Sequence, residues 1–166
     1  MQPWYRHVAN RAYIVLPKSL PARLAASKRI LFSERWLAAP DDGGVFPTNG
    51  DRFVAEELWR LKNLRRPAYK GLLLQGLAAS WHHMGRDRLE SIGANVENVL
   101  VCTGTDDRMI DLRHSDVIAA GIGAGGCKVR TRYFEGVGHA LNWEALDEYN
   151  RMVEEFVVEA SRQLCG

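Results

Sequence analysis

The chain has 166 residues, 46% of them hydrophobic and 25% charged, which is typical of a globular protein of about one domain and excludes disordered and collagen-like chains. The net charge of +2 is small and no nucleic-acid-binding motif accompanies the basic residues, so no nucleic-acid partner is expected. No stretch approaches the roughly 20 apolar residues that span a bilayer, and three cysteines without a Cys-x-x-Cys pair fit a reducing compartment, so a cytoplasmic protein without a membrane span is expected.

Helices are predicted throughout the first half of the chain, up to about residue 95. Leucine, isoleucine and tryptophan side chains predict a helix over residues 20–36. Residues 40–50 (PDDGGVFPTNG) contain prolines, glycines and Asp/Asn turn formers, which predict a loop. Asp51 is a suitable N-cap for the next helix, which Pro67 ends or kinks. The apolar residues of that helix share one face, at Phe53, Val54, Leu58, Leu61 and Leu64.

Two further helices complete the first half: one over residues 69–84, and a short one over residues 86–92 that Gly93 closes. His82 and His83 are adjacent rather than four residues apart, so a metal site on this helix is not expected. Four of the five tryptophans lie in this half. Packing between helices is the simpler interpretation of these side chains, and contact with an apolar ligand is the alternative.

Beyond Val96 the pattern changes to alternating strands and helices. The run VLVCT, residues 99–103, is short, apolar and β-branched, and it predicts a strand that is buried on both faces and stopped by Gly104. Asp111 is predicted to cap a helix that ends in the run GIGAGG, residues 121–126. Because that run follows a helix and not a strand, a helix end and turn is a better interpretation of it than a phosphate-binding loop.

The run KVRTRYF, residues 128–134, alternates apolar and polar residues and predicts a half-exposed strand. Residues 136–141 are expected to form a loop, and Asn142 to cap the last helix. A connection that contains a helix predicts that the two strands are parallel, with a right-handed crossover. The apolar face of the last helix is predicted at Leu146, Tyr149, Val153, Phe156 and Ala160.

Ionisable side chains stand just after each of the two strands: Asp106 and Asp107 after the first, and His139 after the second. Functional groups of an open parallel sheet collect beyond the carboxyl ends of its strands, so a carboxylate and an imidazole are expected within hydrogen-bonding reach of each other. Taken singly, the aspartate could cap a turn and the histidine could be a solvated loop residue. Their order and their shared position after parallel strands favour a functional pair.

These two segments resemble the last two strands of the α/β-hydrolase fold. The family pattern Gly-x-x-Asp is matched by GTDD at residues 104–107, and the pattern Gly-x-Gly-His by GVGH at residues 136–139. The resemblance implies that Asp107 is the acid and His139 the general base of a Ser-Asp-His triad, in the chain order nucleophile, acid, histidine. Asp106 is the alternative acid, because a shift of one residue is open.

The resemblance also implies a division of the chain. Residues 1–95 are expected to form a helical cap or lid-like region, and residues 96–166 the carboxyl-terminal part of an α/β-hydrolase core. The specific motifs lie in residues 96–166, and the final helix of the family is matched by residues 142–163. The expected fold is therefore a partial α/β-hydrolase fold.

The family's nucleophile is missing from this pattern. None of the seven serines lies in a Gly-x-Ser-x-Gly elbow, and Ser80, the most attractive of them, has no glycine two residues to either side. By family order the elbow belongs upstream of the cap, so before Met1. A truncated or partial hydrolase is the favoured explanation, because two parallel strands alone make a poor sheet. The alternative is a short protein that keeps the fold's tail without its chemistry.

The expected parent enzyme would hydrolyse an ester, an amide or a related bond of a small apolar substrate, and no metal or organic cofactor is implied. The chain alone is expected to be inactive, because it has no nucleophilic serine. The alternative function is that of a non-catalytic module that binds a small ligand or a protein. A third possibility is that another chain supplies the missing strands; the oligomeric state is not read from the sequence.

Overall fold

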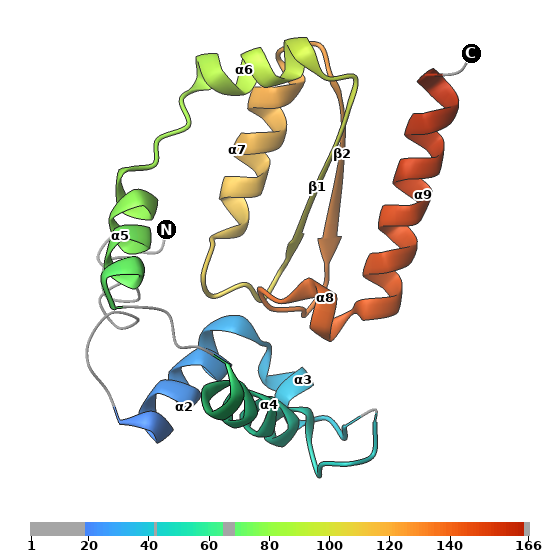
Figure 1. Ribbon diagram of the computed structural model, residues 1–166. Helices are drawn as coiled ribbons and strands as arrows, with labels where there is room; N and C mark the ends of the chain where they lie inside the picture. Colours follow the sequence, from blue (N-terminus) through green and yellow to red (C-terminus); the bar gives the residue numbers. More distant parts are fainter. Residues whose placement is uncertain (1–18, 42, 65–68, 165–166) are drawn as a thin grey trace. The chain divides into compact units, whose positions relative to one another are not determined.

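The computed structural model describes residues 19–41, 43–64 and 69–164, which form eight helices and a two-stranded parallel sheet (Figure 1). The fold is mixed α/β. It divides into two compact units: the first comprises the described residues of Met1–Ile30 and Glu34–His83, and the second those of Leu31–Ser33 and Met84–Gly166. In the described ranges, every helix is too short or too polar to cross a membrane.

The first unit consists of helices. The helix predicted over residues 20–36 is interrupted after Leu31, and the N–H of Ser33 donates to the side chain of Glu144 at 2.8 Å. A second helix starts directly after this interruption. The helices of this part of the chain are α2 (Leu20–Leu31), α3 (Glu34–Ala38), α4 (Asn49–Asn63) and α5 (Tyr69–Trp81).

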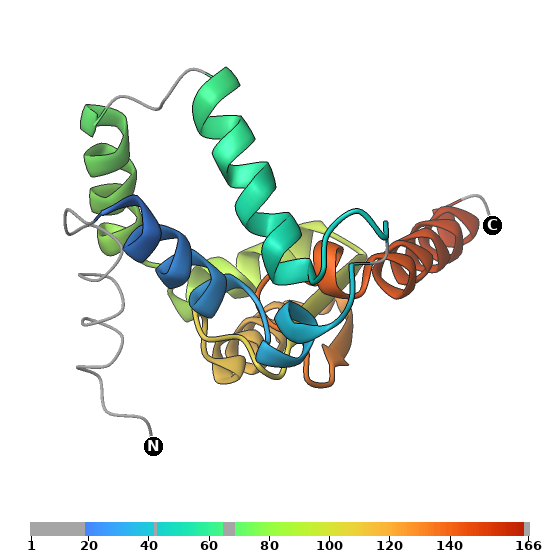
Figure 2. The same cartoon turned by 90° about the horizontal axis from the view of Figure 1, so that it is seen from below.

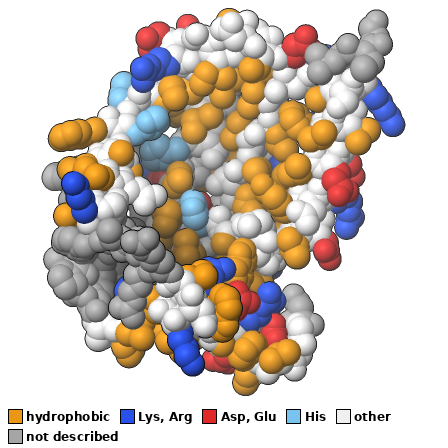
Figure 3. Space-filling model, in the orientation of Figure 1, with side chains coloured by type: hydrophobic (Ala, Val, Ile, Leu, Met, Phe, Trp, Pro, Cys, Tyr) orange, Lys and Arg blue, Asp and Glu red, His pale blue; other side chains and the backbone are white. Residues whose placement is uncertain are grey.

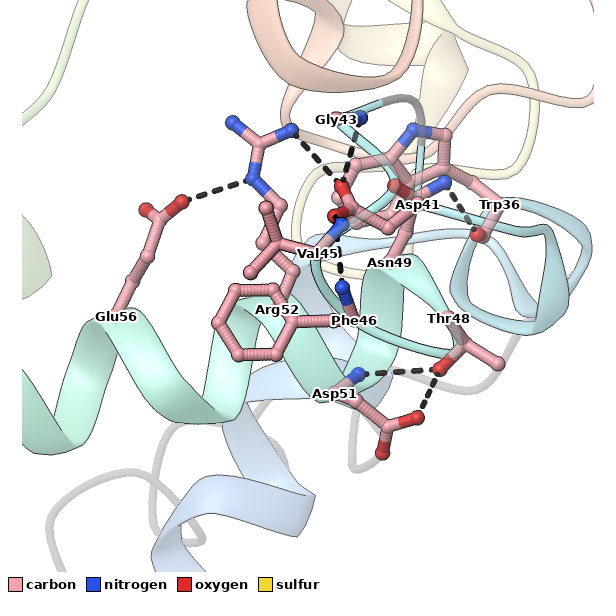
Figure 4. Close-up of polar contacts among 10 residues, drawn as sticks. All are labelled: Trp36, Asp41, Gly43, Val45, Phe46, Thr48, Asn49, Asp51, Arg52 and Glu56. Atoms are coloured by element: carbon pink, nitrogen blue, oxygen red, sulfur yellow. Dashed lines mark hydrogen bonds and ion pairs between the residues drawn. The ribbon is translucent and has the colours of Figure 1, made fainter.

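The loop before α4 is organised by the carboxylate of Asp41 (Figure 4). The N–H groups of Val45 and Phe46 donate to its Oδ2 at 3.1 Å, and that of Gly43 donates to its Oδ1 at 3.3 Å. Arg52 of α4 pairs with the same carboxylate at 3.5 Å. Burial acts to raise the pKa of Asp41, but the backbone donors, Phe46 foremost, and the charge of Arg52 together lower it.

The N-cap of α4 is Thr48, so the prediction of Asp51 was wrong. The hydroxyl of Thr48 accepts the N–H of Asp51 at 3.1 Å and donates to the carboxylate of Asp51 at 2.7 Å (Figure 4). A hydroxyl can do both at once, which is why threonine takes the cap and the acid takes a place in the first turn. The helix ends at Asn63, and Pro67 lies outside the described residues.

The predicted apolar face of α4 is only partly buried. Phe53 is 4% exposed, whereas Leu58 and Leu64 are 42% and 54% exposed. The next helix, α5, is shorter than predicted and ends at Trp81. Ser80 lies in the last turn of α5, and its side chain is outside what the structure describes.

The second unit is built on two strands, β1 (Asn98–Gly104) and β2 (Lys128–Phe134), which pair in parallel along their whole length. The helix α7 (Leu112–Gly123) joins them. Its N-cap is Asp111, whose carboxylate accepts the N–H of Arg113 at 3.0 Å. The two strands, their parallel direction and the cap at Asp111 are thus confirmed.

Helices cover both faces of this sheet. The strands lie between α7 and α9 (Leu146–Leu164) in both Figure 1 and Figure 2. Alternate residues of each strand point to opposite faces, and two apolar clusters follow this division. The cluster on the side of α7 and α6 (Arg86–Asn95) comprises Leu89, Ile122 and Cys127 with Val99 and Val129. The cluster on the side of α9 comprises Phe134, Val137 and Leu141 with Cys102, Ala145, Tyr149 and Met152.

Gly93 does not end α6, which continues to Asn95. The glycine is required there by close backbone packing against the end of α7. A Cβ at Gly93 would lie 1.9 Å from the carbonyl oxygen of Ile122, and a Cβ at Gly125 would lie 2.1 Å from that of Glu90. Glycines therefore let α6 and the end of α7 approach each other backbone to backbone. The run GIGAGG ends α7 and forms a turn, as predicted.

The start of the last helix also differs from the prediction. Asn142 is not its cap, because it lies inside a separate short helix, α8 (Leu141–Glu144), and α9 begins at Leu146. The side chain of Leu146 is 52% exposed and does not belong to the packed face. The other four predicted face residues are half-buried, and they are Tyr149, Val153, Phe156 and Ala160.

The sheet leaves apolar surface uncovered. Strand β1 is not buried on both faces as predicted, since five of its seven residues are only half-buried. It pairs with β2 along one edge and, in the part of the chain that is described, with no strand along the other. Figure 3 shows hydrophobic side chains gathered over the strands and the helices beside them. The exposed apolar residues of these helices include Val117 and Ile118 of α7, and Val157 and Val158 of α9.

Candidate active site

The loops that follow β1 and β2 are bonded directly to each other. The N–H of Thr105 donates to the carbonyl of Phe134 at 3.0 Å, and that of Asp106 donates to the carbonyl of Val137 at 2.9 Å. In return, the N–H of Gly136 donates to the Thr105 hydroxyl at 2.8 Å. The carboxyl ends of the two parallel strands are therefore held together by hydrogen bonds that involve no ionisable side chain.

Gly104, the last residue of β1, makes this close approach possible. A Cβ at this position would lie 2.1 Å from the carbonyl oxygen of Val137 and 2.3 Å from that of Gly138. Both are backbone atoms, which cannot move aside as the tip of a side chain can. The glycine that opens the GTDD motif is thus required by the loop that carries the histidine.

Asp107 and His139 meet at this end of the sheet. The His139 Nδ1 lies 2.8 Å from the Asp107 Oδ2. The other carboxylate oxygen, Oδ1, accepts the N–H groups of Met109 at 2.7 Å and Ile110 at 2.9 Å. The side chain of Asp107 is 6% exposed and that of His139 is 31% exposed. The carboxylate is thus fixed by its own loop and turned toward the ring.

This geometry brings together Asp107 and His139, as expected from the sequence, and it leaves Asp106 out of the pair. Asp106 is exposed, and its backbone N–H is engaged with Val137. Of the two aspartates that follow β1, Asp107 is therefore the one that contacts the ring.

The contact determines which ring nitrogen carries the proton. An ionised carboxylate only accepts hydrogen bonds, so Nδ1 of His139 is the donor and Nε2 of the neutral ring keeps its lone pair. The hydrogen bond to Asp107 raises the pKa of His139 above its ordinary value of 6.5, although partial burial of the ring acts against the rise. The negative charge of Asp107 adds to it. Such a pair can take a proton at Nε2 and hold the resulting imidazolium.

A second carboxylate, which was not predicted from the sequence, accepts hydrogen bonds from the backbone of the histidine loop. Oε1 of Glu144 accepts the N–H of Gly138 at 3.1 Å and the N–H of Ser33 at 2.8 Å. Its Oε2 accepts the Ser33 hydroxyl at 2.5 Å. Glu144 is near His139 in sequence, which is the one signal that could have drawn attention to it. Ser33 carries no such signal, because it lies 111 residues away from its partner.

No serine whose side chain the structure describes is bonded to His139, and the one hydrogen bond of the ring in the described residues is to Asp107. Ser33 is fully buried, and its hydroxyl is held by Glu144. The hydroxyl of Ser161 donates to the carbonyl of Val157 within α9. A nucleophile for the pair is therefore not found among the described side chains.

In the described ranges, no group of three or more His, Cys, Asp or Glu side chains is placed to hold a metal ion.

The sequence matches no protein-family model, and it matches no curated protein. What the site can do therefore has to be inferred from the contacts of Asp107 and His139.

Proposed function

We propose that this chain is the carboxyl-terminal part of a serine hydrolase of the α/β-hydrolase type, with Asp107 as the triad acid and His139 as the general base. The observation that carries the proposal is the bond between Nδ1 of His139 and Oδ2 of Asp107, made at the carboxyl ends of two parallel strands. The acid is fixed by two backbone donors and the base keeps Nε2 available, which is the division of work that a triad requires.

The proposed reaction proceeds in two steps. Nε2 of His139 takes the proton of a serine hydroxyl while the serine oxygen attacks the carbonyl carbon of an ester or amide. The imidazolium then gives this proton to the leaving alcohol or amine, and an acyl-enzyme remains. In the second step Nε2 of His139 takes a proton from water while the water oxygen attacks the acyl carbon. The bond between the acyl carbon and the serine oxygen then breaks, the imidazolium returns the proton to the serine oxygen, and the carboxylic acid is released. Asp107 stays ionised throughout and holds the ring in one tautomer.

The nucleophile of the proposed enzyme lies in a strand-to-helix turn outside the sequence given. Two observations support this part of the proposal. The free edge of β1 has unpaired backbone groups in the described structure, and such edges require a neighbouring strand or a cover. The half-buried residues of β1 and the exposed Val117 of α7 leave an apolar surface that additional strands and helices would cover.

The proposal is tested by labelling with a fluorophosphonate, which reacts covalently with activated serines. Two proteins are compared: the 166-residue chain, and the product of the full reading frame that contains it. We expect the longer product to be labelled on a serine outside residues 1–166, and labelling to be lost in His139→Ala. The matched control is His114→Ala, which removes an exposed histidine of α7 and should leave labelling unchanged.

Two results would contradict the proposal. Labelling of a serine within residues 1–166 that depends on His139 would show that the nucleophile is in this chain. A full reading frame that yields no labelled serine would show that the pair does not serve a serine nucleophile.

One observation favours the alternative of a non-catalytic binding module. The first unit has an open hollow of about 560 Å³ lined by Phe46, Ala55, Glu56, Trp59 and Arg60. The Trp59 side chain is 60% exposed there, where it could contact a small apolar ligand. Saturable quenching of tryptophan fluorescence by a short-chain fatty acid or an aromatic acid, lost in Trp59→Ala and kept in Trp81→Ala, would support this function. Absence of quenching in the folded chain would count against it.

A further inference from the structure

We propose that Glu144 is a positioning residue for His139, acting through the backbone of the loop that carries the histidine. This inference rests on the proposed function for its catalytic consequence, because the position of the ring affects catalysis only if His139 works as a base. It concerns how the imidazole is held, and it assigns to Glu144 no contact with substrate.

The bonds around His139 define two supports. The ring is held by Asp107 through Nδ1. The backbone is held on both sides of the histidine: the N–H of Gly138 donates to Glu144 at 3.1 Å, and the N–H of Ala140 donates to the carbonyl of Leu31 at 3.1 Å. A hydrogen bond from the ring fixes the direction of the imidazole only if the backbone from which the ring projects is itself fixed.

The carboxylate of Glu144 is well placed for this work because both of its oxygens are engaged. Its Oε1 receives Gly138 and the backbone of Ser33, and its Oε2 receives the Ser33 hydroxyl. Ser33 is fully buried, so water does not compete for these bonds at that end. Hydrogen bonds to a carboxylate are about twice as strong as bonds between neutral groups.

Packing around Gly138 fixes the same arrangement. A Cβ at this position would lie 2.6 Å from Oε1 of Glu144, 2.8 Å from the N of Ser33 and 2.9 Å from the carbonyl oxygen of Leu31. Phe32 and Trp143, which flank this arrangement in sequence, pack against each other with their rings tilted at 58° and their centroids 5.7 Å apart. The residue before the histidine is thus enclosed by the three-residue segment Leu31–Ser33 and by Glu144.

The test is nuclear magnetic resonance of the 166-residue chain, with His139 as the reporter. The two readouts are the pKa of His139 and the exchange rate of its Nδ1–H with water, neither of which requires turnover. Glu144→Leu removes the acceptor at similar volume, and Glu144→Gln keeps an oxygen that can accept from Gly138. Glu148→Gln is the matched control, since Glu148 is an exposed residue of α9 that pairs with Arg132.

We expect Glu144→Leu to exchange the Nδ1–H about tenfold faster, the effect of losing about one hydrogen bond. We also expect its His139 pKa to fall toward 6.5, the ordinary value. Glu144→Gln should restore most of the exchange protection, and Glu148→Gln should behave as the unmodified chain. If Glu144→Leu does not fold, Ser33→Ala replaces it, because it frees Oε2 of Glu144 and should raise the exchange rate by a smaller factor.

An unchanged His139 pKa and an unchanged exchange rate in folded Glu144→Leu, or in Ser33→Ala where the leucine variant does not fold, would overturn the proposal. So would an equal change in Glu148→Gln. These outcomes are independent of the labelling experiment. If the serine label is absent but the resonance results are as expected, the hydrolase proposal fails and Glu144 still positions the ring.

Discussion

Two buried aspartates each organise a loop in this protein, and they do so in different ways. Asp41 accepts three backbone N–H groups from its own loop, and its charged partner, Arg52, is 11 residues away. Asp107 accepts two backbone N–H groups, from Met109 and Ile110, and its remaining oxygen reaches His139, 32 residues away. Both carboxylates accept backbone N–H groups of the loop that follows them, but the distant partner of each differs in kind.

The difference separates a structural carboxylate from a candidate catalytic one. Arginine is protonated at all physiological pH values, so the contact between Asp41 and Arg52 has a single state. Histidine changes its charge near neutrality, so the contact between Asp107 and His139 has two. An aspartate that caps its own loop is common, and what marks Asp107 is that its free oxygen is directed at a group that can transfer a proton.

The largest expected effect on stability comes from the close backbone packing of the histidine loop. Gly104→Ala forces a Cβ against two carbonyl oxygens of the histidine loop, and we expect it to destabilise the protein by about 3 kcal/mol. It should also abolish the Nδ1–H resonance of His139. The matched control is Gly123→Ala, whose Cβ would meet a methyl group of Val129 at 3.8 Å, an ordinary contact. Urea unfolding of both variants is the measurement, and equal midpoints would contradict the expectation.

The largest expected effect on the labelling rate comes from a direct comparison of the two carboxylates. In the full reading-frame product, Asp107→Asn keeps an oxygen for the N–H groups of Met109 and Ile110 but no longer favours the Nδ1–H tautomer of His139. We expect fluorophosphonate labelling to slow by about four orders of magnitude, the effect of this change in serine-protease triads. Asp41→Asn should lower the unfolding midpoint and leave the labelling rate unchanged. Slower labelling in both variants would show that the comparison does not hold.

The pH dependence of stability should differ in sign between the two sites. The pKa of His139 is raised on folding, so its contribution to the free energy of unfolding is complete below about pH 6.5. This contribution is lost as the pH rises through the raised pKa. The pKa of Asp41 is lowered, so its contribution to the free energy of unfolding is present above the ordinary value of 3.8 and is lost as the pH falls through the lowered value.

The measurement is urea unfolding of the chain, His139→Gln and Asp41→Asn between pH 3 and pH 9. The difference in the free energy of unfolding between the unmodified chain and His139→Gln should shrink toward high pH. The corresponding difference for Asp41→Asn should shrink toward low pH. Two differences that shrink at the same end of the range would contradict the assignment.

The smallest expected effect is the loss of an exposed ion pair, against which the stability changes at the two loops can be compared. Glu90→Gln breaks a surface pair on α6, where Arg86 and Glu90 lie 2.8 Å apart with 83% and 41% of their side chains exposed. Solvent screens such pairs, so we expect the free energy of unfolding to change by less than about 0.5 kcal/mol. A larger loss would mean that α6 contributes to stability through more than its packing against α7.

The second unit could be predicted from the sequence because its signals are local. The run VLVCT, the alternating run KVRTRYF and the cap at Asp111 each lie within a few residues of the structure they specify. The rule that side chains meet beyond the ends of parallel strands then placed Asp107 near His139. The local signals did not choose between Asp106 and Asp107, because that choice depends on the turn that follows β1.

The errors have non-local or competing causes. At the break after Leu31, the N–H of Ser33 donates to Glu144, far along the chain, and no periodicity within α2 predicts this contact. Gly93 resembles a helix stop in sequence, but its role is set by the carbonyl of Ile122 on another helix. At the start of α4, Thr48 and Asp51 are both good caps, and only the reciprocal bond between them decides.

The bond between Ser33 and Glu144 has a consequence for the order in which the second unit folds. It joins residues separated by 111 positions, so the chain between them must close into a long loop before the bond forms. Contacts of such separation are entropically costly early in folding. We therefore expect the helix α6, the strands and α7 to assemble first, and the last step to be the arrival of Leu31–Ser33 behind the histidine. A chain that has completed its sheet would still lack the contacts between Leu31–Ser33 and the histidine loop until this segment docks.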